Sequence, residues 1–236
     1  MKLSAQTLSI LKNFAGMNLG LIVKKGSKIE TVSTSKTIYG VATLDDKFPV
    51  NFAIHDMSKF LNSLGLFTNP VLEFKDTYVV ITEENSKSSV KYYYSQEETI
   101  QGPPDADKKK KMVDATSVPD IEFTLTEEDF KQLKKAAGIL GSPNFVVESD
   151  GTTINIVVTD LENPTDNRCV IELGEGDGSE YSMVFKMDNL KLLEGSYEVK
   201  VASKGISHFK NLSIDLAYFV SLDASASKFS KSASGE

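Results

Sequence analysis

The chain is poor in the residue types on which many enzymes and secreted proteins depend: it has no tryptophan, one cysteine, two histidines and one arginine. Cys169 alone cannot form an internal disulfide or a structural zinc site, so we expect a small buried or half-buried side chain in a reducing cytoplasm. No stretch approaches the roughly 20 apolar residues of a membrane span. The first seven residues contain no apolar signal core, so we expect no secretion.

Catalytic signatures are also missing. His55 and His208 lie in different halves of the chain, and neither belongs to a Cys/His or Ser/His/Asp pattern. The glycines of segment 174–178 are spaced somewhat like a phosphate-binding loop, but the acids between them would repel phosphate and no Lys-Ser/Thr pair follows. We therefore predict a protein that is not an enzyme and has no metal and no cofactor.

The residues that are present can build packed cores. Forty per cent of the 236 residues are hydrophobic, including 13 Phe and 8 Tyr, which excludes a disordered chain and suits two domains of middling size. The net charge of −7 is unevenly placed: residues 1–100 hold 11 lysines and ten acids, whereas residues 101–236 hold 15 basic and 23 acidic residues. Much of the acidic excess falls in 160–180, which we interpret as solvated loops around one strand.

The two halves of the chain nearly repeat one another. Segment 3–12 is matched 122 positions later, and in both copies a hydroxyl residue, Ser4 or Thr126, precedes apolar residues at three- and four-residue steps. This pattern predicts a capped amphipathic helix in each copy. Segment 56–61 is matched 132 positions later by 188–193, and each is predicted to be a short helix capped by an aspartate.

The predicted strands repeat in the same order. Segments 21–26 and 146–151 are each predicted to be a strand that runs into a turn glycine. Each short helix lies between two predicted strands. The strand before it is 48–54 in the first copy and 181–186 in the second, and the strand after it is 78–82 in the first copy and 197–202 in the second. One helix match could arise by chance, but four ordered matches favour an internal duplication.

The duplication predicts an α+β fold of two similar domains, each with two helices packed on antiparallel sheets. We place an N-terminal domain at 1–100, a proline-broken charged connector at 101–119, a C-terminal domain at 120–225 and a flexible tail at 226–236. Each predicted helix buries one face and shows lysine and small polar residues on the other, which by itself is typical of a solvated surface. The basic residues are almost all lysines. Lysine attracts phosphates, but it lacks the bidentate hydrogen bonding with which arginine recognises guanine.

A family resemblance rests on several short runs. These are Met1-Lys2-Leu3-Ser4 with Leu11–Ala15, then Phe52–Asp56, Gly195-Ser196-Tyr197 and the closing strand Ala217–Leu222. The chain resembles the sliding clamps of the large contractile-tailed bacteriophages from residue 1 to about residue 225, and the opening run is the most specific part. The resemblance implies the DNA-clamp fold and a head-to-tail homotrimeric ring around duplex DNA in the cytoplasm of an infected bacterium. It also implies a DNA polymerase partner, an ATP-driven clamp loader and a role in late transcription with RNA polymerase factors.

The ring implied by the resemblance would bring lysines of the helices to its hole. The DNA-facing residues that we predict are Lys2 at the margin with Lys12, Lys59, Lys131, Lys134, Lys135 and Lys191. Uniform lysine–phosphate contacts would hold a clamp on DNA without fixing its position.

The resemblance also implies an apolar partner pocket near the connector. We assign to it Met112 and Val113 of the connector, and Tyr218, Phe219 and Val220 of the closing strand. Because side chains alternate along a strand, only one face can serve the pocket, and the sequence leaves open which one. The run 108–111 consists of four lysines and departs from the family pattern. It either forms a solvated loop or attracts an acidic tail of a partner.

One further class of protein competes with the clamp. A virion structural or adhesion protein would also be rich in β-strands, acidic and oligomeric. That alternative does not explain lysine-bearing helices repeated in phase, so the sequence favours a sliding clamp that confers processivity on a replicative DNA polymerase.

Overall fold

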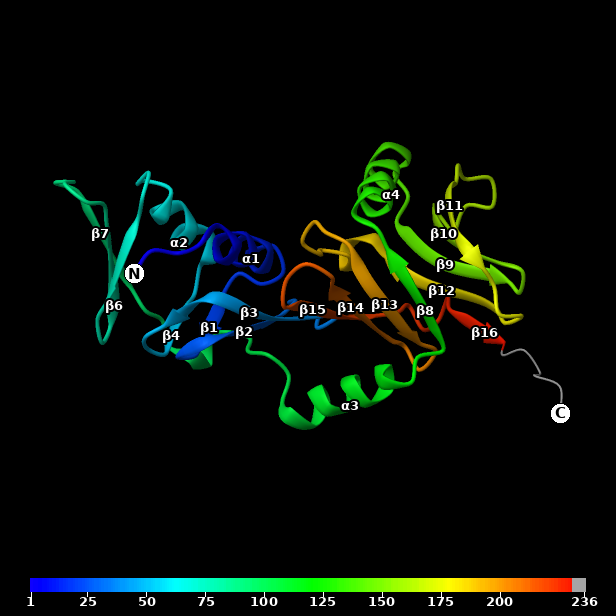
Figure 1. The fold of residues 1–236 in the computed structure, drawn as a ribbon, viewed down its shortest axis with the longest axis horizontal. Helices are drawn as coiled ribbons and strands as arrows, with labels where there is room; N and C mark the ends of the chain where they lie inside the picture. Colours follow the sequence, from blue (N-terminus) through cyan, green and yellow to red (C-terminus); the bar gives the residue numbers. More distant parts are fainter. Residues whose placement is uncertain (231–236) are drawn as a thin grey trace. The chain divides into compact units, whose positions relative to one another are not determined.

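A computed structural model describes residues 1–230 and shows an α+β protein that divides into two compact units. The first unit is Met1–Asp105, and the second begins at Ala106. The chain runs from blue to red in Figure 1. Among the described residues no helix is long and apolar enough to cross a membrane.

The first unit contains the two helices that the sequence predicts. Helix α1 (Ala5–Ala15) begins after Ser4, whose Oγ accepts a hydrogen bond from the Thr7 backbone N–H at 3.1 Å. Helix α2 (Met57–Leu64) begins after Asp56, whose carboxylate accepts from the Lys59 N–H at 2.9 Å. Each cap satisfies a backbone donor that the first helical turn leaves without a partner. Both capping predictions are therefore confirmed.

Seven strands of the first unit form two antiparallel groups. The first group follows the order β4-β1-β2-β3, with β1 (Leu21–Val23), β2 (Gly26–Val32), β3 (Ile38–Phe48) and β4 (Phe52–Ile54). The second group is β5 (Val71–Phe74), β6 (Tyr78–Thr82) and β7 (Ser89–Tyr93), followed by the 3-10 turn η1 (Glu97–Thr99). The single strand predicted at 48–54 is wrong. The chain breaks between β3 and β4, at Pro49, because proline has no N–H for a strand ladder.

The second unit starts with helix α3 (Ala106–Ser117), strand β8 (Ile121–Leu125) and helix α4 (Glu127–Leu140). Thr126 caps α4 by accepting from the Asp129 N–H at 3.1 Å, as predicted. Gly141 ends the helix at φ 70°, a left-handed conformation that glycine adopts without strain. Figure 1 shows α3 and α4 on opposite sides of the strands of this unit.

The strands of the second unit also form two antiparallel groups. The first has the order β11-β10-β9-β12-β16 and comprises β9 (Asn144–Asp150), β10 (Thr153–Thr159), β11 (Cys169–Glu175), β12 (Glu180–Lys186) and β16 (Lys228–Ser230). The other has the order β15-β14-β13-β8, with β13 (Tyr197–Ala202), β14 (Ile206–Asn211) and β15 (Leu216–Ser221). The acidic segment 160–180 consists of loops around the single strand β11 with the start of β12, close to the prediction.

The helix predicted at 188–193 is wrong, because the chain makes only the 3-10 turn η2 (Met187–Asn189) there. Two tyrosine hydroxyls take up the backbone groups of Leu193: the Tyr197 hydroxyl donates to its carbonyl at 2.5 Å, and its N–H donates to the Tyr218 hydroxyl at 3.2 Å. Leu190 and Leu192 are both buried, a two-residue spacing that suits an extended segment better than a helix.

The connector and the tail are more ordered than the sequence predicts. Most of the connector predicted at 101–119 is helix α3, so the lysine run 108–111 lies on a helix and not in a loop. The tail predicted to be flexible from 226 instead continues into β16, where Phe229 pairs with Tyr181 of β12. The prediction is therefore wrong up to residue 230, and its remainder, 231–236, lies outside the described residues.

Candidate functional site

The first unit presents lysines on the exposed side of two neighbouring helices. Helices α1 and α2 contact each other, and their inward faces bury residues such as Ile10 and Phe60. Lys12 is exposed and forms no ion pair with any of residues 1–230. Lys59 is also exposed, and its Nζ lies 3.3 Å from the Asp56 carboxylate. Lys2 lies exposed just before α1.

The three lysines of α4 differ in how strongly the protein already neutralises them. Lys131 Nζ lies 2.5 Å from a Glu127 carboxylate oxygen and 3.4 Å from Glu194, and the hydrogen bond to Glu127 is the main reason that its pKa is raised. Lys134 Nζ lies 5.3 Å from the centre of the Phe130 ring, within cation–π range. Lys135 is exposed and has no ion-pair partner in the described part of the chain. Lys134 and Lys135 are thus the more available charges.

Lys191 differs from the other predicted DNA-facing residues. It is exposed, but it follows η2 in an irregular segment because the predicted helix does not form. Five of the seven lysines lie on exposed helix surfaces, one lies before α1 and one lies after η2.

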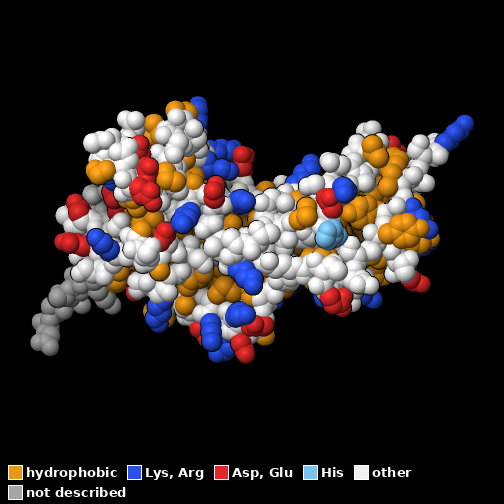
Figure 2. Space-filling view, turned by 180° about the vertical axis from the view of Figure 1, so that it is seen from behind, with side chains coloured by type: hydrophobic (Ala, Val, Ile, Leu, Met, Phe, Trp, Pro, Cys, Tyr) orange, Lys and Arg blue, Asp and Glu red, His pale blue; other side chains and the backbone are white. Residues whose placement is uncertain are grey.

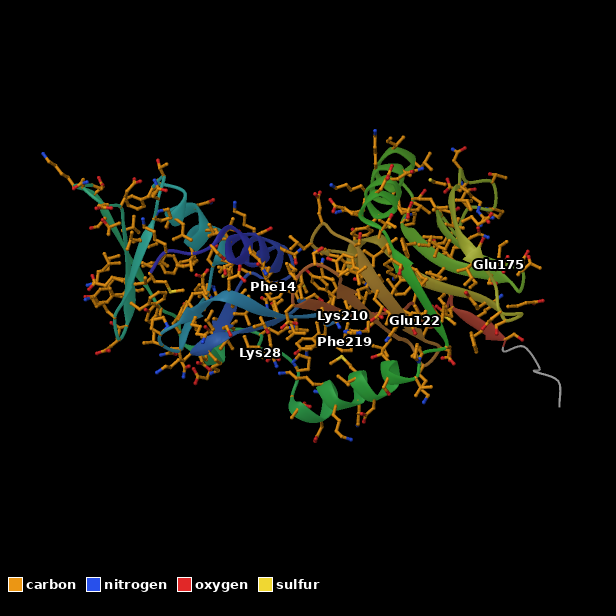
Figure 3. The ribbon with its side chains drawn as sticks, in the orientation of Figure 1. Phe14, Lys28, Glu122, Glu175, Lys210 and Phe219 are labelled. Atoms are coloured by element: carbon orange, nitrogen blue, oxygen red, sulfur yellow. The ribbon has the colours of Figure 1, made fainter. Side chains whose placement is uncertain are left out.

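The closing strand places its predicted pocket residues on two faces. Tyr218 and Val220 of β15 are fully buried in the core of the second unit, where the Tyr218 ring lies 6.2 Å from that of Tyr197. Their predicted role in a partner pocket is therefore wrong, since no accessible side chain remains. Phe219 points to the other face and stacks on His208 of β14 with ring centres 4.7 Å apart, but it is itself only 6% exposed. Figure 3 labels Phe219 and Lys210, which come from these two neighbouring strands.

Helix α3 packs against the same side of the second unit. It contacts β13 and β14 and buries Thr116. Met112 is half-buried, whereas the Val113 residue is 53% exposed. Burial, with the positive charge of nearby Lys200, lowers the pKa of His208. The two connector residues predicted for a pocket thus lie on α3, and Val113 is the more accessible one.

Two edge strands carry exposed side chains that the sequence reasoning missed. At the β7 edge Tyr93 is 62% exposed, and Lys91 Nζ lies 3.8 Å above the Tyr78 ring. Figure 2 shows hydrophobic side chains gathered over this end of the first unit. At the β11 edge Val170 is 53% exposed, and Glu175, labelled in Figure 3, is exposed at the end of the strand. The order of the strands in a sheet is a property of the fold, so the sequence did not identify β7 and β11 as edges.

The arrangement of strands and helices is shared with solved PCNA and beta-clamp structures. The fold matches the PCNA of A. fulgidus, solved with the C-terminal region of FEN-1, with a TM-score of 0.64 and 12% identity over 91% of this chain and 94% of that one. It matches the H. pylori beta clamp with a TM-score of 0.63 and 13% identity, covering 94% of this chain and 65% of the other. The protein therefore has the DNA-clamp fold.

Sequence comparison identifies the family. The model for "DNA polymerase processivity factor" matches residues 3–100, and the model for "gp45 sliding clamp, C terminal" matches residues 122–224. The sliding clamp of Vibrio phage KVP40 is 32% identical over 227 residues, which cover 95% of this chain and all of that protein. The sliding clamp of Escherichia phage RB69 is 27% identical over 209 residues, covering 87% and 89%. The chain belongs to the phage sliding-clamp family.

Family membership confirms the main functional prediction. The protein is a sliding clamp, a processivity factor for DNA polymerase, and sliding clamps are not enzymes. The alternative of a virion structural or adhesion protein is excluded.

Proposed function

We propose that three copies of this chain close head to tail into a ring around duplex DNA, with the lysine-bearing sides of α1, α2 and α4 facing the DNA. The observation that carries the proposal is that helices in both units bury an apolar face and expose lysines on the other, several of them, such as Lys12 and Lys135, without an ion-pair partner among residues 1–230. The ring would have a mass of about 78 kDa, three times 25.9 kDa.

Lysine suits this surface because a clamp must stay on DNA and yet move along it. An ammonium group is a mobile point charge that attracts phosphates without fixing a register. Closure of the ring supplies retention, so the individual contacts can remain weak and sensitive to salt. Acidic loops elsewhere, such as 160–168, would discourage nucleic acid from binding outside the hole.

The exposed edges of β7 and β11 fit the two sides of the head-to-tail interface. An unpaired strand edge presents backbone donors and acceptors that another strand can complete. The β7 side carries Lys91 and Tyr93, whereas the β11 side carries Val170, Glu172 and Glu175, so apolar contact and opposite charge would both favour this pairing. Replacing Tyr93 by Asp should reduce the mass measured by light scattering from trimer to monomer, and replacing exposed Leu212 by Asp should not.

A partner site on the second unit would lie beside α3. Phe219 and His208 lie on the side of β14 and β15 that faces away from the Tyr218 core, and α3 adds Met112 and Val113. We propose that a DNA polymerase tail binds here, that an ATP-driven clamp loader and late-transcription factors of RNA polymerase use the same surface, and that the complex works in the cytoplasm of the infected bacterium. Met112-Val113 changed to Ser-Ser should weaken binding of the polymerase tail peptide by about 1–3 kcal/mol in calorimetry.

Topological retention tests the ring directly. The clamp is loaded onto nicked circular DNA, separated by gel filtration, and one half of the sample is linearised by a restriction enzyme. Protein should stay on the circle and slide off the linear molecule. Equal retention on both forms, or equal loss from both, would contradict encirclement.

A further inference from the structure

A groove of about 730 Å³ opens at the carboxyl end of α4, entirely within the second unit. Its walls come from the last turn of α4, the loop after β10, the start of η2 and the turn before β16. The volume lies within the range of roughly 300–1,000 Å³ that binding sites occupy. Neither the lysine face nor the α3 surface described above includes this groove.

The helical wall of the groove is exposed main chain. Gly138 and Gly141 line it, and a Cβ built on either would meet no atom within 4 Å. Glycine inside a helix is less favourable than alanine, and at Gly138 the free space gives no steric reason for it. Gly141 follows the helix, and its left-handed φ of 70° by itself favours glycine. Helix α4 has three acids in its first turn and no base in its last, so the protein leaves the negative end of the helix dipole uncompensated.

The rim of the groove adds carboxylates with no partner. Glu162 and Asp188 are exposed, and their side chains form no hydrogen bond or ion pair with any residue from 1 to 230. Two other lining acids already have roles in turns: Asp160 accepts from the Glu162 N–H at 2.9 Å, and Asp223 accepts from Ser225 at 2.6 Å. The one lysine that lines the groove, Lys186, lies 3.8 Å from Asp223. The groove therefore has an excess of negative charge.

Apolar surface lies beside these charges. Leu161 lines the groove and is 47% exposed, and Ala137 and Met187 lie in the same lining. A lysine or arginine side chain combines a charged head with an aliphatic stem, which suits a site that places carboxylates next to aliphatic side chains. Nucleic acid is disfavoured, because its phosphates would face Glu162, Asp188 and the negative helix end.

We propose that this groove docks a basic segment of a partner protein. One lysine or arginine head of that segment would lie against the carboxyl end of α4 and between Glu162 and Asp188. Its stem and an adjoining aliphatic residue would cover Leu161. The clamp would then have a protein-docking site selected by charge, separate from the apolar surface beside α3.

Binding of the full-length protein to peptide libraries with fixed central residues can test this site. Three immobilised hexapeptide libraries carry Lys-Arg, Ser-Ser or Glu-Glu at the two central positions and random residues around them. Fluorescently labelled clamp should bind the Lys-Arg library about tenfold better than the Ser-Ser library and should avoid Glu-Glu. In the E162K/D188K variant this preference should disappear or invert.

A steric variant and a charge control make the outcome specific. Gly138→Leu fills the open space with a strong helix former, so α4 should persist by circular dichroism while Lys-Arg binding falls about tenfold. The E84K/E98K variant makes the same change in net charge at exposed sites of the first unit and should bind like the parent. Equal binding by the parent, E162K/D188K and Gly138→Leu would overturn the proposal. So would an equal loss in E84K/E98K, which would indicate attraction by net charge alone.

Discussion

The two units of the clamp share one capped helix and then diverge. Helix α1 and helix α4 each begin after a hydroxyl cap, and Leu11 of α1 and Leu133 of α4 occupy matching buried positions. At the next matched site Asp56 caps α2, but Asp188 lies in η2, where the tyrosine hydroxyls hold the backbone of Leu193. A repeated hydrophobic pattern therefore preserves the position of an element in the fold, while local tertiary contacts decide whether it becomes a helix.

The units also differ in charge. The first hundred residues are nearly neutral, whereas the rest of the chain is strongly acidic, yet lysines occupy the exposed helix surfaces in both. Net charge therefore says little about a protein that contacts DNA through one surface. The location of each charge on its element is the informative quantity.

The largest expected effect tests whether the matched leucines are equivalent in packing. Leu11→Ala and Leu133→Ala should each lower the free energy of unfolding by about 2–5 kcal/mol, because each removes a fully buried side chain. Urea denaturation followed by circular dichroism measures the change. Exposed Ser9→Ala on α1 is the control and should stay within about 0.5 kcal/mol of the parent. A small loss at one leucine alone would show that the two helices are not packed alike.

The next effect concerns the lysines of α4. The K134E/K135E variant should lose about tenfold or more in retention on nicked circular DNA. The decrease of DNA affinity with salt concentration should become less steep, by the equivalent of about two phosphate contacts. Lys131→Glu should have a smaller effect, because Glu127 and Glu194 already pair with that lysine. Lys204→Glu, exposed in the β13–β14 turn, is the matched control for Lys131→Glu. If Lys131→Glu alone matched the double variant, the assignment of available charges would fail.

Helix caps should give a smaller change and sharpen the comparison of α1 with α4. Ser4→Ala and Thr126→Ala each remove the acceptor for a backbone N–H at 3.1 Å, and each should cost about 1 kcal/mol. The loss should be greater at α1, because α4 keeps three acids in its first turn and α1 has none. Thermal unfolding of both variants would show the difference, and a larger loss at α4 would contradict the dipole argument.

The smallest expected effect is a loss of α2 stability at acidic pH. Hydrogen bonding from the Lys59 backbone N–H is the main cause that holds the pKa of Asp56 below its usual value. A carboxylate whose folded-state pKa is depressed stabilises the protein above its unfolded pKa of about 3.9 and loses that contribution as the pH falls through the folded value. The protection of the α2 amides, measured relative to their intrinsic exchange rates, should therefore fall below about pH 4. In Asp56→Asn this pH dependence should be absent, and its persistence would point to another group.

The starts of three helices could be predicted from local sequence. The caps at Ser4, Asp56 and Thr126 have short-range hydrogen-bonding partners three residues ahead, so their signal lies within one turn of chain. The connector was harder, because α3 is stabilised by packing on β13 and β14, which come about 80 to 100 residues later. The partner surface was also undecided, since strand alternation separates Phe219 from Tyr218 without saying which one faces the core.

The sequence by itself determined the repeated hydrophobic pattern, the starts of α1, α2 and α4, the lysine-bearing helix surfaces and the resemblance to the clamp family, because periodicity, caps and residue identities are local properties of the chain. Only the tertiary structure decided that 188–193 is not helical, that the lysine run lies on α3, that Tyr218 and Val220 are core residues, and that β7 and β11 are edges. Each of these depends on contacts between residues far apart in the chain. The acidic groove at the end of α4 has the same origin, because its walls come from four separate segments that only the fold brings together.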